Sequence, residues 1–224
     1  MFDLIAPRYD AFTRVFSFGM DRRWKELLVS AARDSIARGG IVCDGATGTG
    51  DLAFALGAAR PDLHIAATDV SWRMLRMAYA RRLRGGETNI VVSAGDLSAL
   101  PFPDASLDAI TAGYALRNTP DWRATIVELA RVIRPGGHLF TLDFFLPRSS
   151  AWRAAFLGWL SAAGRAVGWW WHREPMAYGY IAASIRHFTT AGAFSEALAR
   201  SGFEVRTLHP RLGGGIAVHH AVRR

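Results

Sequence analysis

A glycine-rich segment with an acid at each end is the part of this sequence best suited to chemistry. Residues 44–51 read Asp-Gly-Ala-Thr-Gly-Thr-Gly-Asp, after the apolar run 41–43 and before the helix-like run 52–59. A strand, a glycine turn and a helix in that order bind nucleotide-like ligands, because glycines let a ligand approach the backbone. Asp51 would repel a pyrophosphate seated at the start of that helix. S-adenosylmethionine, with its sulfonium, α-ammonium and ribose, fits the charge pattern better.

Other candidates for the same ligand stand where the following predicted strands end. Asp69 closes the second strand, where a carboxylate can accept hydrogen bonds from both ribose hydroxyls. Asp96 follows the third strand, near the place expected for an adenine amino group, and Leu97 can pack on the adenine ring. Gly113 ends the fourth strand. Because ligands of open α/β sheets bind at the carboxyl ends of the strands, these positions predict one cofactor cleft.

The elements that must position these residues alternate along the chain. Helices are expected over 21–38, with Asp21 as N-cap, and over 52–59, 71–84 and 122–133. Strands are expected over 41–44, 64–69, 89–94, 107–112 and 138–144, the last one after a turn at 134–137. This alternation predicts an α/β fold with a mostly parallel sheet between helices.

The last part of the chain breaks the alternation. Residues 203–209 and 216–222 read as two strands joined by a loop too short for a crossover helix, so they must be antiparallel. A mostly parallel sheet with a C-terminal antiparallel hairpin distinguishes a Rossmann-like, class I S-adenosylmethionine-dependent methyltransferase from a dehydrogenase. The sequence therefore predicts a single methyltransferase domain over residues 1–224.

The charge and the motifs of the sequence limit which binding partners the protein can have. The formal net charge is +8, and Lys25 is the only lysine among 27 basic residues. Two interpretations of this charge remain open. The basic surface either merely reflects an arginine-rich composition or attracts an anionic membrane. No motif of a nucleic-acid-binding domain and no metal-ligand spacing is present, so we expect no nucleic acid and no metal. No pattern in the sequence indicates an oligomeric state.

The single cysteine and the termini bear on the compartment. Cys43 alone cannot form an intramolecular disulfide, which favours a reducing compartment. The first residues lack the basic start and apolar run of a signal peptide. The segment 151–171 is the nearest candidate for a membrane span, but Arg153 and Arg165 interrupt it. We expect a cytoplasmic protein.

Several blocks carry a resemblance to a known family. They are the opening segment 2–10 with 17–19 and 24–25, the loop 46–51, and the segments 100–104, 116–118 and 131–137. Over nearly the whole chain these blocks resemble the UbiE/MenG/COQ5 family of quinone C-methyltransferases. The opening segment and Leu116-Arg117-Asn118 are the specific blocks, whereas 131–137 is shared with many methyltransferases. Thr13, Gly113 and the pair 182–183 depart from the usual family pattern.

The resemblance implies methyl transfer from S-adenosylmethionine to a ring carbon of a polyprenylated quinol. Demethylmenaquinol, or the equivalent substrate of the ubiquinone pathway, is the expected acceptor. Tyr9, Arg117 and Asn118 match residues at the reacting end. A guanidinium is a poor base, so we assign Arg117 stabilisation of the quinolate oxygen, with Asn118 orienting the ring. The cofactor-binding residues expected from the loop, the strand ends and the resemblance are Asp44, Gly48, Thr49, Gly50, Asp69, Asp96, Leu97 and Gly113.

Two segments outside the sheet are expected to cover the site. They are an N-terminal helical lid, 1–38, and a helical insert, 145–200. One apolar helical face of the insert is formed by Trp152, Phe156, Trp159, Ala163, Ala166 and Trp170. This face either packs on the sheet or forms, with apolar residues of 12–18, a channel for a long-tailed substrate. Trp169-Trp170-Trp171 suit a membrane interface, so we expect peripheral association at the inner face of the membrane.

Two other functions share these features. A phospholipid N-methyltransferase would have the same loop, basicity and apolar lid, although an amine acceptor does not need Arg117. A catalytically silent methyltransferase fold that binds lipid would not need a complete cofactor cleft. Four histidines, His172, His187, His219 and His220, lie in the insert or the last strand, and each is more simply structural than a base. Since His219 and His220 are consecutive on a strand, only one of them can face inward.

Overall fold

The structure is a computed structural model that describes residues 19–172 and 182–224. The first 18 residues of the predicted N-terminal lid 1–38, including Tyr9, lie outside the described residues. The same holds for 173–181 and for the side chains of 166–172, so the interfacial tryptophans 169–171 are not described.

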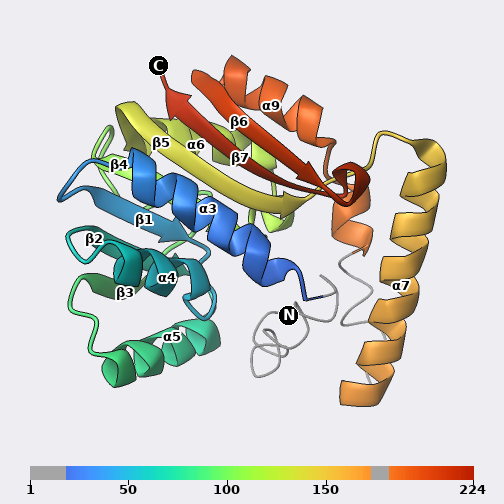
Figure 1. The fold of residues 1–224 in the computed structure, drawn as a ribbon, viewed down its shortest axis with the longest axis horizontal. Coiled ribbons are helices and arrows are strands. Elements are labelled where there is room, and N and C mark those ends of the chain that lie inside the picture. The colour runs from blue at the N-terminus through green and yellow to red at the C-terminus, as the bar shows by residue number, and fades with distance from the viewer. Residues whose placement is uncertain (1–18, 173–181) are drawn as a thin grey trace.

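The centre of the fold is a seven-stranded sheet in the order β3-β2-β1-β4-β5-β7-β6 (Figure 1). The strands are β1 Ile41–Gly45, β2 His64–Asp69, β3 Ile90–Ala94, β4 Leu107–Gly113, β5 Ile133–Phe144, β6 Phe203–Arg211 and β7 Ile216–Arg223. Strands β1 to β5 pair in parallel, and β7 is antiparallel to both β5 and β6. The predicted methyltransferase sheet with its antiparallel end is confirmed.

Helices cover both faces of this sheet. They are α3 Asp21–Ser35, α4 Asp51–Ala59, α5 Trp72–Gly85, α6 Trp122–Val132 and α9 Ala191–Arg200, whereas α7 Ser150–His172 lies beyond the end of the sheet (Figure 1). Figure 1 shows α3 and α4 on one face and α6 and α9 on the other. Each face has its own apolar core: Leu28, Phe54 and Phe140 belong to the first, and Ile126 and Phe194 to the second. Burial of this apolar surface is the main favourable contribution to folding.

Three details differ from the sequence prediction. The helix predicted over 21–38 ends at Ser35. Asp21 is not an N-cap: Met20 holds that position, and the Asp21 carboxylate instead accepts a hydrogen bond from the Tyr114 hydroxyl at 2.7 Å. Strand β5 begins at Ile133, not at 138, because Ile133 already pairs with Leu107. The expected turn at 134–137 is therefore an irregularity within β5, with Gly136 at φ +78°.

Helix α7 lies at the end of the molecule beyond the sheet (Figure 1). Its most buried apolar side chains are Phe156, Leu157 and Leu160, which join the core of the α3 face. Trp152, the first residue of the predicted apolar face, is 42% exposed. Relative to the predicted apolar face, the buried face of α7 is therefore rotated towards Leu157 and Leu160. The described part of α7 supports the first alternative, packing on the core, over a substrate channel. None of the described helices is long and apolar enough to span a membrane.

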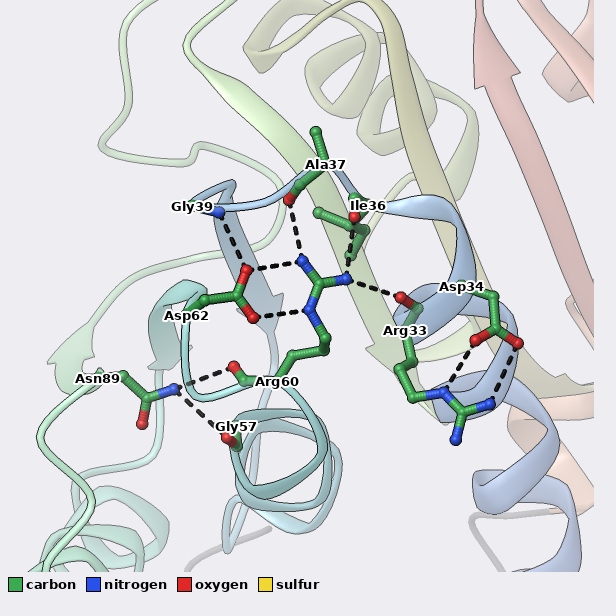
Figure 2. Close-up of polar contacts among 9 residues, drawn as sticks. All are labelled: Arg33, Asp34, Ile36, Ala37, Gly39, Gly57, Arg60, Asp62 and Asn89. Atoms are coloured by element: carbon green, nitrogen blue, oxygen red, sulfur yellow. Dashed lines mark hydrogen bonds and ion pairs between the residues drawn. The ribbon is translucent and has the colours of Figure 1, made fainter.

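The end of α3 is held by an arginine from the end of α4 (Figure 2). The Arg60 guanidinium donates to three backbone carbonyl oxygens, those of Arg33 at 2.7 Å, Ile36 at 3.0 Å and Ala37 at 3.2 Å. It also pairs with both oxygens of Asp62, at 2.7 and 2.8 Å, and Asp62 accepts from the Gly39 backbone N–H. The last carbonyls of a helix have no partner within it, so Arg60 fixes where α3 ends and β1 begins.

We expect Arg60→Met to lower the free energy of unfolding by about 1–2 kcal/mol, because the carbonyls at the end of α3 lose a charged donor. Urea denaturation followed by circular dichroism measures this difference. Arg206→Met is the matched control, since Arg206 forms only an exposed ion pair with Glu204, and it should change stability by less than about 0.5 kcal/mol. Equal midpoints for Arg60→Met and the unmodified protein would contradict this account.

Candidate active site

One cleft lies at the carboxyl ends of the parallel strands and has a volume of about 220 Å³. Its lining includes every predicted cofactor residue except Gly50, namely Asp44, Gly48, Thr49, Asp69, Asp96, Leu97 and Gly113. Asn118 also lines the cleft, whereas Arg117 does not. The alternation of strands and helices read from the sequence therefore brings the cofactor candidates to one place.

The glycine loop needs its glycines for conformation. Gly48 and Gly50 have φ of +58° and +88°, a left-handed region that disfavours side chains. Gly50 precedes α4 directly, and a Cβ at Gly50 would lie 2.4 Å from the ring of Phe54. Gly50 thus shapes the loop from behind, while Gly48 has open space where its Cβ would point. A ligand can approach the backbone at Gly48.

Asp44 holds the loop from within the sheet. It is 1% exposed and accepts hydrogen bonds from the hydroxyls of Thr47 at 2.5 Å and Thr111 at 2.6 Å and from the Ala53 backbone N–H at 3.2 Å. Burial raises the pKa of the Asp44 carboxyl to about 6, although these three donors favour its ionised form. No lysine or arginine of the described chain forms an ion pair with Asp44, so a cation in the cleft would stabilise it.

Asp69 and the segment after β3 complete the cofactor side. Asp69 accepts from the backbone N–H groups of Gly48 and Ser71, both at 2.8 Å, which ties the glycine loop to β2. Asp96 is exposed and accepts from the Ser98 backbone N–H at 2.8 Å. Leu97 is buried at 4% exposure and forms an apolar wall next to it. A nucleoside requires a carboxylate that can accept from ribose hydroxyls and an apolar surface on which a purine can pack.

The acid at the other end of the loop has a different environment from the one expected. Asp51 pairs with Lys25 at 2.8 Å and with Arg81 at 2.7 Å. Its charge is therefore balanced within the protein, and the case for a cationic ligand depends on Asp44 and Asp69. Burial alone would lower the pKa of Lys25 and raise that of Asp51. The ionised partners of each group outweigh burial, so the pKa of Lys25 is raised and that of Asp51 is lowered.

Lys25 lines the cleft and was not among the predicted site residues. Besides Asp51 it pairs with Asp21 at 2.8 Å, and Asp21 accepts from Tyr114, so α3, α4 and the end of β4 form one polar network. Tyr114 itself has φ +57°, an unfavourable value for a residue with a side chain. The only lysine of the sequence was the available signal for this network, but nothing local to Tyr114 marked it.

The two predicted catalytic residues of the Leu116–Asn118 turn differ in their access to the cleft, because Asn118 lines it and Arg117 does not. The Arg117 side chain is 5% exposed and pairs with the buried Asp143 at 2.6 Å. Arg117 Nη1 and Asn118 Nδ2 both donate to the Tyr114 carbonyl, at 2.9 and 2.8 Å. Asn118 Oδ1 is buried and has no hydrogen-bond partner within the described chain. Because Asn118 lines the cleft, this oxygen is suited to accept a hydrogen bond from a ligand.

Asp143 was missed by the sequence analysis. It lies at the carboxyl end of β5, accepts from the backbone N–H groups of Arg117 and Phe144, and is 1% exposed. The strand-end rule that selected Asp69, Asp96 and Gly113 also applies to β5, and it would have selected this residue. Arg117 further stacks over Phe144, with its guanidinium carbon 5.1 Å from the ring centroid.

The described histidines do not line the cleft. His219 and His220 point to opposite sides of β7, as predicted: His219 is fully buried beside Phe194, and His220 bonds to His138 at 3.1 Å on the other face. His187 is exposed, and the His172 side chain lies outside the described residues. A structural role is the simpler interpretation of His219, whose Nε2 donates to the Ala191 carbonyl at 3.2 Å.

We expect His219 to make the protein less stable in acid. Burial lowers the pKa of His219 from 6.5 to about 4, so between these pH values the unfolded chain binds the proton and the folded chain does not. Stability should fall as the pH decreases through this range, by about 3 kcal/mol in total from this group. In His219→Phe this contribution to the pH dependence of the free energy of unfolding should vanish.

Urea denaturation of both proteins from pH 7 to pH 4 tests the effect of His219. Asp44 acts in the opposite sense, because its pKa is raised on folding, but it is present in both proteins and cancels from the comparison. Parallel stability curves for the two proteins would show that His219 does not carry the acid sensitivity.

A mostly parallel sheet with an antiparallel end defines a class of protein, together with a glycine loop after β1 and acids at the ends of β1 and β2 and after β3. It is the class of S-adenosylmethionine-dependent methyltransferases. The cleft can accommodate this cofactor, because Asp44 supplies a buried negative charge, the Asp69 carboxylate could accept hydrogen bonds from a ribose, and Leu97 offers an apolar surface against which an adenine could pack.

Comparison with known proteins identifies the family. The model of the ubiE/COQ5 methyltransferase family matches residues 1–223. The chain belongs to this family. It is 35% identical to the ubiquinone/menaquinone biosynthesis C-methyltransferase UbiE of Methylobacterium nodulans, over 99% of this chain and 88% of that protein. It is 34% identical to the demethylmenaquinone methyltransferase of Thermus thermophilus, over 98% of each chain.

Solved structures agree on the fold. A SAM-dependent methyltransferase of Thermotoga maritima, described as a possible histamine N-methyltransferase, aligns with a TM-score of 0.64 over the full length of both chains at 19% identity. A putative methyltransferase of Haloferax volcanii, solved with its activator Trm112, aligns with a TM-score of 0.69 over 100% of this chain and 97% of that one, at 18% identity. At such identities the similarity concerns the fold alone.

Proposed function

We propose that this protein methylates a ring carbon of a polyprenylated quinol, with demethylmenaquinol as the expected acceptor and S-adenosylmethionine as methyl donor. The observation that carries the proposal is the position of Asn118, from the specific Leu116–Asn118 block, in the wall of the cleft that holds Asp44 and Asp69. The names of the UbiE and demethylmenaquinone methyltransferase relatives support the choice of acceptor.

The chemistry requires a nucleophilic ring carbon placed in line with a methyl group. S-adenosylmethionine supplies that methyl group on a positively charged sulfur. Asp69 would hold the ribose, and Asp44 would favour the positive charge from below the loop. Asn118 Oδ1, the unpartnered acceptor, is suited to hold a quinol hydroxyl and so to orient the ring. A closed cleft would exclude water, which would otherwise compete for these polar groups.

Arg117 has a less direct part in this proposal than in the sequence prediction. It does not line the cleft, and it pairs with Asp143. Together with Asn118 it fixes the Tyr114 carbonyl, and its permanent positive charge lies behind the turn that faces the acceptor. We assign it electrostatic stabilisation of the quinolate and positioning of Asn118, with no role as a base.

The polyprenyl tail of the proposed substrate determines where in the cell the protein must act. A polyprenyl chain stays in the bilayer, so the protein must reach the membrane surface. We propose that it is a cytoplasmic protein that associates with the inner face of the membrane. The predicted lids 1–38 and 145–200 include α3 and α9, which pack on the sheet, so only the remaining parts of these segments would cover the cleft around the acceptor. The apolar side of α7, with Phe156 and Leu160 buried, would form the inner wall of the insert.

Deletion of the gene in its own host tests the proposed reaction. Mass spectrometry of the extracted quinones should show a demethylated quinone that accumulates, and a plasmid copy of the gene should restore the methylated one. An unchanged quinone pool would overturn the proposal. Altered phospholipid headgroups with normal quinones would indicate a phospholipid N-methyltransferase, and failure of the purified chain to bind S-adenosylmethionine would indicate a silent fold.

A further inference from the structure

The outer side of α5 exposes large apolar side chains to an unusual degree. Trp72 is 70% exposed, Leu83 65% and Tyr79 48%, and Met77 of the same helix is also exposed. Val70, just before the helix, is 70% exposed. Scattered exposed apolar residues are ordinary on a protein surface, but a cluster on one helix indicates an interaction site.

The helical repeat places these side chains in one stripe. Trp72, Tyr79 and Leu83 are separated by seven and four residues, so they lie on the same face of α5. The opposite face, with Met74, Leu75 and Ala78, is buried against the sheet. Figure 1 shows α5 at the β3 edge of the molecule, with no other element on its outer side. The stripe is therefore a second apolar face that packs on nothing in the described chain.

Arginines flank this stripe, and the helix contains no acid. The sequence of α5 includes five arginines, of which Arg81 turns inward to Asp51 and Arg82 to the Glu87 carbonyl. Arg76 lies within the stripe, four residues after Trp72, and Arg84 follows Leu83. Both are exposed, and neither forms an ion pair with a carboxylate of the described residues. Their charge faces solvent together with the apolar side chains.

We propose that the outer face of α5 docks on an anionic phospholipid surface. Indole and phenol rings bind at the headgroup level of a bilayer, leucine inserts below it, and arginine attracts anionic headgroups. A nucleic acid would use the arginines but not Leu83 and Met77. A second protein copy would bury the apolar stripe but would bring Arg76 and Arg84 against their own equivalents. The membrane is the partner that satisfies both features.

Docking through α5 would place the cleft at the membrane surface. Val70 and Met74, at the start of α5, belong to the cleft lining. A helix that lies in the headgroup layer would therefore keep the cleft within reach of an acceptor whose tail remains in the bilayer. This placement rests on the proposed function, but lipid binding by α5 itself does not depend on methyl transfer.

Sedimentation of the full-length protein with sucrose-loaded vesicles, without quinol, tests the docking surface. The vesicles contain phosphatidylcholine either alone or mixed with phosphatidylglycerol. We expect binding at least about 10-fold tighter to the anionic vesicles, weakened by salt. Trp72→Ser with Leu83→Ser should lower the partition coefficient about 10-fold or more. Arg76→Glu with Arg84→Glu should remove the preference for anionic vesicles.

Matched variants separate this surface from general hydrophobicity and charge. Val127→Ser with Leu208→Ser removes two exposed apolar side chains elsewhere, and Arg38→Glu with Arg200→Glu makes the same change of net charge away from α5. Both controls should bind vesicles within about 2-fold of the unmodified protein. Affinity for S-adenosylmethionine, measured by calorimetry, should be unchanged in the α5 variants, which shows that they are folded.

Several results would overturn the docking proposal. They are an absence of vesicle binding by the unmodified protein, equal binding by the α5 variants, and equal losses in the control variants. Loss of a dimer in the Trp72 and Leu83 variant with unchanged vesicle binding would assign the stripe to a second copy. Vesicle binding without any methylation would instead overturn the proposed reaction and leave the docking surface standing.

Discussion

Asp69→Ala is expected to raise the dissociation constant for S-adenosylmethionine about 100-fold. Asp69 accepts from the backbone of Gly48 and Ser71, so it both anchors the glycine loop and faces the cleft where a ribose would lie. Hydrogen bonds to a charged group contribute about 1.5–3 kcal/mol each, and loss of the two bonds from the ribose hydroxyls at the lower end of this range accounts for the expected factor. Isothermal titration calorimetry at fixed pH and salt measures it.

A charge-matched control makes the Asp69 result specific. Asp34→Ala removes an exposed carboxylate of α3 that pairs with Arg33, far from the lining residues, and should leave the dissociation constant within about 2-fold. Equal affinity in Asp69→Ala and the unmodified protein would mean that the cofactor does not use this carboxylate, and that the cleft has been assigned wrongly.

Asp143→Leu is expected to lower the free energy of unfolding by about 3–5 kcal/mol, the largest loss of stability in this chain that we expect from one polar group. Arg117 is nearly fully buried and pairs with Asp143 at 2.6 Å, so the substitution leaves a buried guanidinium without its counter-charge. Thermal and urea denaturation measure the loss.

Arg117→Ala should lower the methylation rate while leaving affinity for S-adenosylmethionine nearly unchanged.

The double variant Arg117→Met with Asp143→Leu separates stability from catalysis. Replacing both members of a buried ion pair by apolar side chains removes the unpaired charge, so most of the lost stability should return. The methylation rate should stay low, because the positive charge near Asn118 is gone. Recovery of both stability and activity would contradict the electrostatic role of Arg117 and show that the pair is structural.

The fold was predictable to a large extent because it is encoded locally. Apolar runs separated by helical periods and glycine turns indicated the strands, and the loop at Gly213–Gly215 was too short for a crossover, which determined the antiparallel end. The misjudged boundaries, Asp21 and 134–137, depend on partners far along the chain. The Asp21 carboxylate accepts a hydrogen bond from Tyr114, 93 positions away, and Ile133 pairs with Leu107 of the neighbouring strand β4.

The cofactor side of the site was predictable for a related reason. Each strand of a parallel sheet ends at the same edge, so position along the chain translates into position in the cleft, as it does for Asp44 and Asp69. The acceptor side follows no such rule. Lys25 reaches the cleft from a helix before the sheet, and Arg117 turns to Asp143 instead of to the cleft, because a buried guanidinium needs a counter-charge.

The most direct test of the central claim is the product formed from S-adenosylmethionine that carries a trideuteriomethyl group. The purified protein is incubated with demethylmenaquinol in detergent micelles, and the extracted quinone is analysed by mass spectrometry and proton NMR. We predict a menaquinone with one trideuteriomethyl group and without the ring proton at the methylated carbon. Demethylmenaquinone recovered unlabelled, or a quinol methyl ether labelled on oxygen with the ring proton retained, would contradict ring-carbon methylation by this protein.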